Sequence, residues 1–222
     1  MAHAIAHIPP DTLLFERNRR GERVRLGAGA FGVVYKAAHL GAPVAAKCVC
    51  RPPPGHPDAA QWPSDVAAFW REAELQYRLR DEHVVVVHGA AEFLDEGGEA
   101  EELALVMALA PRGSLAGWLA GEEGRAAPRL PRLRAVLDVA RGLRYLHAPG
   151  RDVVHADVKP SNVLLARAGA RCSRIWGCPA CARRGMRRAL RCAARAARRC
   201  TWRPSCGGAA RCARSATCTR CA

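Results

Sequence analysis

Apolar positions in the first half of the chain come in short runs that are typical of strands. Residues 22–34 are β-prone and interrupted only by glycines, and residues 43–50 form a second apolar run. The pattern predicts a strand, a glycine turn and two further strands, followed by a loop over the proline-rich residues 51–63. Two more buried strands are expected at residues 84–87 and 103–109, separated by an acidic loop.

Two longer stretches have the spacing of amphipathic helices. The first is residues 64–80, where Ser64 or Asp65 can cap the start, and the second is residues 130–147. A mostly β unit followed by helices predicts an α+β, two-lobed architecture. The residues expected to face inward are Val66, Phe69, Ala73 and Tyr77 in the first helix and Leu133, Val136, Leu137, Ala140, Leu143 and Leu146 in the second.

Charge and cysteine divide the chain near residue 170. The net charge is +15, and residues 171–222 hold 14 arginines and nine of the 11 cysteines, without lysine or acidic residues. No apolar run reaches the roughly 18 residues of a membrane span, and the start lacks a secretory signal, so we expect no membrane association and an intracellular, cytoplasmic setting. In that reducing setting Cys48 and Cys50 are expected to be ordinary strand residues without a disulfide.

The glycines near the start form a motif of phosphate-binding loops. Gly27, Gly29 and Gly32, followed by Val34, fit G-x-G-x-x-G-x-V. Dinucleotide-binding folds use similar glycines, but they need a helix directly after them. The β-rich run that follows here favours a hairpin whose backbone N–H groups close over phosphates.

A lysine lies inside the next apolar strand. Lys47 ends the string Val-Ala-Ala-Lys, and a charge in such a strand is costly unless it meets an anion. Glu72 and Glu74 on the following helix could each pair with it. The alternative is that both glutamates are solvent-exposed charges on the helix surface.

A third motif follows the second helix. Residues 155–165 read His-Ala-Asp-Val-Lys-Pro-Ser-Asn-Val-Leu-Leu. This stretch resembles the catalytic loop H-R-D-L-K-x-x-N of eukaryotic-type Ser/Thr protein kinases, and the two earlier motifs stand in that family's order. The resemblance, over about Leu13–Leu165, implies a protein-kinase-like fold that is truncated after the catalytic loop, with an antiparallel sheet and one helix in its first lobe. The implied divisions are an extension over 1–20, an ATP-binding lobe over 21–110, the start of a helical lobe over 111–167 and a tail over 168–222.

The resemblance also implies an activity and its residues. The enzyme would transfer the γ-phosphate of ATP to a Ser or Thr hydroxyl of a protein, with ATP and Mg²⁺ as cofactors. Asp157 would accept the hydroxyl proton, Lys159 would neutralise the γ-phosphate and Asn162 would hold one Mg²⁺. Glu72 is favoured over Glu74 because Phe-Trp-Arg-Glu is similar to the family's run-up to its paired glutamate. The expected nucleotide contacts are Gly27, Gly29, Gly32, Lys47 and Glu72 for the phosphates, Val34, Ala45 and Leu164 around the adenine, Met107 behind it, and backbone groups of residues 108–110.

Three departures from the family pattern change the expectation. Ala156 replaces an arginine that would bind a phosphorylated activation loop, so switching of that kind is not expected. Gln76 stands where the helix normally presents an apolar residue. Nothing after Leu165 supplies the D-F-G aspartate, the A-P-E motif or the helical floor of the larger lobe. The chain as written is therefore expected to be a poor catalyst, and a nucleotide-binding module without turnover is the alternative.

The tail, residues 168–222, has three explanations. Two C-x-x-C pairs suggest zinc, but 36 residues separate them and five other cysteines remain in the tail. The arginines suggest nucleic acid, but no aromatic residues are interleaved with them, so a nucleic-acid partner is not expected. The favoured explanation is a shifted reading frame and a disordered tail, because codons shifted by one base over residues 172–180 permit Val-Leu-Ala-Asp-Leu-Gly-Leu-Ser-Arg. The same shift over residues 196–204 permits Gly-Thr-Pro-Val-Tyr-Met-Ala-Pro.

Overall fold

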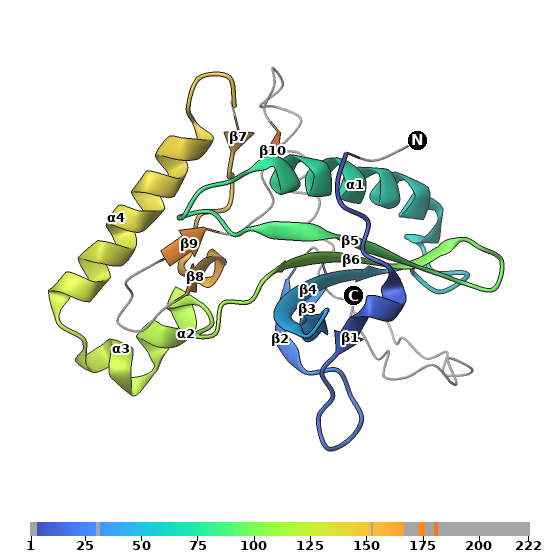
Figure 1. The fold of residues 1–222 in the computed structure, drawn as a ribbon, viewed down its shortest axis with the longest axis horizontal. Coiled ribbons are helices and arrows are strands. Elements are labelled where there is room, and N and C mark those ends of the chain that lie inside the picture. Colours follow the sequence, from blue (N-terminus) through green and yellow to red (C-terminus); the bar gives the residue numbers. More distant parts are fainter. Residues whose placement is uncertain (1–3, 30–31, 152, 167–172, 176–179, 182–222) are drawn as a thin grey trace, which may run out of the picture.

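The computed structural model describes residues 4–29, 32–151, 153–166, 173–175 and 180–181. Most of the predicted tail, with every C-x-x-C cysteine except Cys181, therefore lies outside the described residues, and its predicted disorder stays untested. In Figure 1 a curled sheet with α1 across it forms one part of the molecule, and α2, α3 and α4 gather beside it. The strands are β1 (Leu13–Phe15), β2 (Arg25–Gly29), β3 (Gly32–His39), β4 (Ala42–Cys50), β5 (Val87–Leu94), β6 (Ala100–Ala108), β7 (Val153–Val154), β8 (Val163–Leu165), β9 (Ser173–Ile175) and β10 (Ala180–Cys181). The helices are α1 (Trp62–Arg78), α2 (Leu115–Ala120), α3 (Glu122–Ala126) and α4 (Arg129–Leu146), with 3₁₀ turns at Pro10–Thr12, Ala59–Gln61 and Pro160–Asn162.

The main sheet is antiparallel, as predicted. Its strands follow the order β1-β3-β4-β6-β5, and β2 also pairs with β3. A sheet lobe followed by helices is the α+β, two-lobed architecture that the sequence predicts. The described residues contain no helix long and apolar enough to cross a bilayer.

The glycine motif forms a hairpin and does not open a helix. β2 pairs antiparallel with β3, with Gly29 opposite Gly32. Gly32 has φ +116°, and a Cβ there would lie 2.1 Å from the carbonyl oxygen of Cys48. Only glycine fits this position, because an L side chain would meet both the strained backbone and the neighbouring strand.

Alternation along the central strands divides the core into two layers. On β6, Leu103, Leu105 and Met107 face the α1 side, whereas Ala104 and Val106 face the opposite layer. Successive side chains of a strand point to opposite faces of the sheet. Both sets of side chains can be apolar only when the sheet is covered on both faces. This accounts for the nearly continuous apolar runs in the sequence.

The two strand cysteines, Cys48 and Cys50, are present as thiols on β4. Cys48 is 2% exposed, and burial raises the pKa of its thiol well above the ordinary value, with Glu102 adding to the effect. A buried thiol that stays protonated packs as a small apolar side chain.

The first helix is present but is shifted by two residues at both ends. α1 begins at Trp62 and ends at Arg78, so Ser64 lies inside the first turn and caps nothing. Pro63 fits there because the first turn of a helix does not use its N–H groups. Of the predicted inward face, Ala73 is fully buried and the other three residues pack partly buried; Trp62, Trp70 and Gln76 are buried as well.

The strand predicted at residues 84–87 is displaced. Val84 and Val85 are buried, but they form an extended link, and β5 starts only at Val87 and continues to Leu94. The run is buried and also bonded to the sheet, because the Val86 carbonyl accepts the Ala108 N–H at 2.9 Å. The next strand starts earlier than predicted, at Ala100, because Asp95 Oδ1 accepts the N–H groups of residues 97 and 99 and closes a tight turn.

The second helix lies where it was predicted, but its inward face was predicted only in part: Leu146 is buried and Leu143 packs against the core, whereas Ala140 is exposed. Leu133, Val136 and Leu137 are 49–63% exposed. The positions of α4 that pack against the protein lie mainly toward its C-terminal end and include Val139, Leu143 and Tyr145. Periodicity alone finds an apolar stripe without saying what covers it. The buried residues are Ala135, Asp138, Gly142 and Leu146.

The N-terminal segment is part of the sheet lobe. The Ile8 N–H donates to the Ala90 carbonyl at 2.8 Å, and the Ala90 N–H donates to the Ala6 carbonyl at 3.0 Å. The segment thus extends the free edge of β5. Ile8 is 3% exposed, and a Cβ at Gly89 would lie 2.4 Å from the Ala6 carbonyl oxygen. The close approach explains why the strand has glycine at this point.

We predict that Ile8→Ala destabilises the protein by about 2–4 kcal/mol, because it leaves a cavity between the segment and the sheet. Leu14→Ala is the matched control, since Leu14 is 65% exposed and should cost less than about 0.5 kcal/mol. Urea unfolding followed by circular dichroism measures both. Equal losses in the two variants would show that the segment is not docked.

Candidate active site

Lys47 meets a carboxylate inside the core. It lies on β4, on the same face as Ala45 two residues before it, and it is 7% exposed. Its Nζ atom is 3.3 Å from Oε1 of Glu72 on α1. The anion that a buried ammonium group requires is therefore present.

The two candidate glutamates have different partners. Glu72 pairs with Lys47, whereas Glu74 Oε1 accepts the backbone N–H of Ala4 at 3.1 Å. Glu74 therefore ties α1 to the N-terminal segment. The structure selects Glu72, as the sequence favoured, and excludes the interpretation of Glu72 as a merely solvent-exposed charge.

A third side chain joins this pair. Gln76 Nε2 donates to the same Glu72 Oε1 atom at 2.8 Å. The sequence marked Gln76 only as a departure from an apolar pattern. Its spacing of four residues from Glu72 was the available signal, because residues i and i+4 of a helix are neighbours.

Asp157 lies in the loop between β7 and β8, which apolar residues anchor at both ends. Val153 and Val163 are buried in one cluster, and Leu165 is buried in another. His155 is buried too, and its Nδ1 accepts the Asp157 N–H at 3.3 Å. These anchors fix the backbone and leave the functional side chains between them.

Three predicted residues of this loop converge. Lys159 Nζ lies 2.8 Å from Asp157 Oδ2, and Asn162 Nδ2 donates to the same oxygen at 2.9 Å. Asn162 Nδ2 also lies 2.8 Å from the Asp157 carbonyl oxygen. The Asp157 side chain is 46% exposed, so a held and oriented carboxylate is accessible from solvent.

The four residues expected around the adenine belong to one apolar cluster. Ala45 and Met107 are buried in it, and Val34 and Leu164 pack against it partly buried. Leu164 comes from β8, directly after the Asp157 loop, and therefore connects that loop to the sheet. The expected backbone partner Ala108 is only partly free, because its N–H donates to the Val86 carbonyl at 2.9 Å.

The glycine hairpin is adjacent to the lysine. Val34 on β3 is directly opposite Lys47 on β4, and Val34 also pairs with Gly27 on β2. Gly32 therefore lies on the strand next to Lys47, and Gly27 and Gly29 lie on the strand beyond it. Backbone N–H groups of such a hairpin are suited to bind an anion that the ammonium group also attracts.

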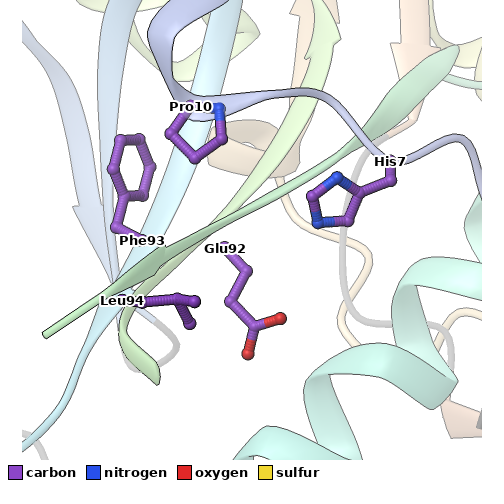
Figure 2. A pocket seen from close by; sticks show the side chains of 5 residues that line it. All are labelled: His7, Pro10, Glu92, Phe93 and Leu94. Atoms are coloured by element: carbon purple, nitrogen blue, oxygen red, sulfur yellow. The ribbon is translucent and has the colours of Figure 1, made fainter. Parts of the chain in front are cut away.

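A hollow elsewhere on the molecule contains none of these residues. It is lined by His7 and Pro10 of the N-terminal segment and by three residues of β5 (Figure 2). Glu92 is its one acidic side chain. The hollow is distinct from the candidate site.

Comparison with known proteins assigns the fold. Residues 21–175 match the protein kinase domain family, which is more than half of the chain. The chain belongs to the protein kinase family. The match extends ten residues beyond Leu165 and includes β9, which pairs with β8.

Relatives of this kinase domain include plant and animal proteins. It is 31% identical to a probable receptor-like protein kinase of Arabidopsis thaliana, over 71% of this chain and 18% of that protein. It is 32% identical to the serine/threonine-protein kinase VIK of Arabidopsis thaliana, over 65% of this chain and 30% of that protein. It is 36% identical to the serine/threonine-protein kinase mos of Xenopus laevis, over 64% of this chain and 36% of that protein. The chain thus spans little more than a third of these relatives, or less.

The described part of the kinase domain offers few ligands for a metal ion. It contains no group of three or more His, Cys, Asp or Glu side chains that could hold one. In the Asp157 loop, the Asp157 carboxylate and the Asn162 amide carry oxygens that suit Mg²⁺. Mg²⁺ accepts so few protein ligands only when phosphates and water complete its octahedron. The residues therefore fit a nucleotide-bound Mg²⁺ and do not form a metal site by themselves.

Ala156 has an unusual backbone conformation within the kinase domain. Its φ is +60°, in the left-handed region that costs a residue with a Cβ roughly 1–2 kcal/mol. The turn at this point aims Asp157 toward Lys159 and Asn162. Alanine holds this conformation at the position where the family pattern has arginine.

We predict that Ala156→Gly stabilises the protein by about 0.5–1 kcal/mol, because glycine adopts this φ without strain. Ala127→Gly is the control, since Ala127 has φ −63° and glycine there should destabilise. Thermal unfolding of both variants gives the sign. Destabilisation by both would show that Ala156 is not in the left-handed region.

Proposed function

We propose that this kinase domain is a serine/threonine kinase domain that binds ATP between the glycine hairpin, Lys47 and Leu164. The observation that carries the proposal is the buried ion pair of Lys47 and Glu72 beside an apolar cluster of the right composition for a base. A purine needs apolar faces, and its phosphates need a fixed cation and backbone N–H groups. The glycine hairpin, Val34 and Lys47 lie on the consecutive strands β2, β3 and β4.

Nucleotide binding follows from this arrangement. The adenine would insert against Val34, Ala45 and Leu164, with Met107 behind it. Lys47, held by Glu72, would contact the α- and β-phosphates, and the glycine hairpin would cover them. A lysine that is already paired and oriented loses little further conformational entropy when the phosphates arrive.

Phosphate transfer would take place at Asp157. A Ser or Thr hydroxyl placed at the carboxylate would give its proton to Asp157 as its oxygen forms the bond to the γ-phosphorus, and the bond to the β–γ bridging oxygen breaks. Lys159 would offset the charge of the transferred group, and Asn162 would keep the carboxylate oriented. Asn162 would also hold a nucleotide-bound Mg²⁺, which would supply neutralisation of the phosphate charge.

The Ser/Thr preference rests on Lys159. A lysine two residues after the catalytic aspartate is typical of Ser/Thr kinases, and two relatives carry the name serine/threonine-protein kinase. The protein substrate and the intracellular setting stay predictions from the sequence, as does the absence of membrane and nucleic-acid partners.

Turnover by the chain as written is expected to be poor. After Asp157 the sequence contains no further acidic residue. A second carboxylate for the phosphate-bound Mg²⁺ is therefore missing, and the developing charge is under-neutralised. Nucleotide binding without turnover is the second candidate function, and this missing carboxylate favours it.

A shifted reading frame in the tail has support from the strand pairing. β9 pairs with β8, and β10 pairs with β7, so residues 173–175 and 180–181 lie beside the two strands that flank the Asp157 loop. The shifted frame would provide an aspartate at position 175, opposite Val163. Direct sequencing of the transcript across codons 168–178 is expected to reveal a one-base or exon-junction correction. A clean transcript in the present frame would refute this, and stoichiometric zinc on the purified protein would then favour a metal-binding tail.

We predict that Lys47→Met weakens ATP binding about 10-fold or more, because a hydrogen-bonded charge contributes about 1.5–3 kcal/mol. Lys36→Met is the matched control, since Lys36 lies on β3 and pairs with Glu16 on the surface. Asp157→Ala should leave ATP affinity within about threefold and abolish any measurable transfer. Titration with a fluorescent ATP analogue and a phosphate-transfer assay give the two readouts. Undiminished binding in Lys47→Met, or transfer that persists in Asp157→Ala, would contradict the assignment.

A further inference from the structure

We infer that Gln76 is a positioning residue: its side-chain amide holds the Glu72 carboxylate against Lys47. This inference rests on the proposed function, because the pair matters for nucleotide binding only if Lys47 contacts the phosphates. It adds a residue that no comparison assigns to the site. The amide would act through Glu72 and would not touch the nucleotide.

Gln76 is one of the few buried polar residues of α1. It is 5% exposed, and its Nε2 donates to Glu72 Oε1 at 2.8 Å. A buried primary amide is costly without a partner, and a bond to a charged acceptor is stronger than a bond to a neutral one. The reverse amide orientation would place two oxygens against each other, so the nitrogen must face the carboxylate.

Both donors meet at one carboxylate oxygen. The amide nitrogen is 2.8 Å from Glu72 Oε1, whereas Lys47 Nζ is 3.3 Å from it. The bond within the helix is the shorter one, so the helix itself fixes the carboxylate and Lys47 reaches toward it. The Glu72 side chain is 20% exposed. Without the amide, Glu72 could rotate toward solvent and leave the ammonium group less well held.

The backbone around Gln76 is held on both sides. Ala73, one turn earlier, is fully buried against the sheet, and the Gln76 carbonyl accepts the Leu79 N–H at 3.1 Å where the helix ends. Gln76 therefore occupies a fixed point in the last turn of α1. A rigid backbone with a single side-chain donor can transmit the position of α1 to the Lys47–Glu72 pair.

The test replaces the amide by an apolar side chain of similar length. Gln76→Met keeps most of the volume and removes the donor, and Gln61→Met makes the same change at an exposed residue without a side-chain bond. We expect Gln76→Met to weaken binding of a fluorescent ATP analogue about threefold to tenfold. Gln61→Met should stay within about 1.5-fold of the wild type.

A double-mutant cycle separates positioning from packing. If Gln76 acts through Glu72, Gln76→Met should add nothing to the loss of affinity caused by Glu72→Gln. Nuclear magnetic resonance gives a direct readout: the Gln76 side-chain amide signals, identified by their loss in Gln76→Met, should shift in Glu72→Gln. Unchanged affinity in Gln76→Met, or an equal loss of affinity in both backgrounds, would overturn the inference.

A final measurement keeps the two proposals distinguishable. If the wild-type protein binds no nucleotide, the proposed function fails, and the positioning role is then decided by the reactivity of Lys47. Acylation by a small amine-reactive reagent, followed by peptide mass spectrometry, should modify Lys47 at least about threefold faster in Gln76→Met than in Gln61→Met, because a less well-held amine reacts more readily. Equal rates would refute the role of Gln76 independently of nucleotide binding.

Discussion

One buried charge constrains the sheet lobe. Lys47 stands in a strand whose neighbours are apolar on both faces, and its ammonium group is tolerable only beside an anion. That requirement fixes where α1 must lie, because Glu72 can reach Lys47 only if the helix packs against the face of the sheet that carries Ala45 and Met107. Trp70 and Ala73 of the same helix are buried in the core. Apolar packing and charge pairing therefore require the same position of α1.

The N-terminal segment strengthens this arrangement from outside. It bonds to β5 through Ala90 and to α1 through Glu74, and His7 stacks on Trp70 with ring centroids 6.5 Å apart. Sheet edge and helix are thereby tied by one stretch of chain. Its attachment is a further reason for α1 to keep a fixed position relative to Lys47, since a helix held at two places has fewer alternative packings.

The sequence was most informative where one residue type alone fits. Gly32 is required by its backbone, and Lys47 by its demand for an anion, so hairpin and ion pair were predictable. The sequence was less informative where the neighbours of a residue in the fold determine its burial or its hydrogen bonds. The α4 stripe around Leu133 looked like a core face, yet that part of it is exposed and the helix packs through Leu143 and Leu146 near its end. Gln76 appeared as an exception to an apolar pattern, because its partner is known only once α1 is in place.

The central claim is that nucleotide binds around Lys47, and hydrogen–deuterium exchange tests it most directly. Exchange of backbone amides should slow when a non-hydrolysable ATP analogue and Mg²⁺ are added, because bound and covered N–H groups open less often. The account predicts slower exchange in peptides that contain the glycine hairpin, Lys47 and β8, and no change around the hollow of Glu92 and Phe93. Slower exchange confined to the hollow, or none anywhere at saturating nucleotide, would contradict it.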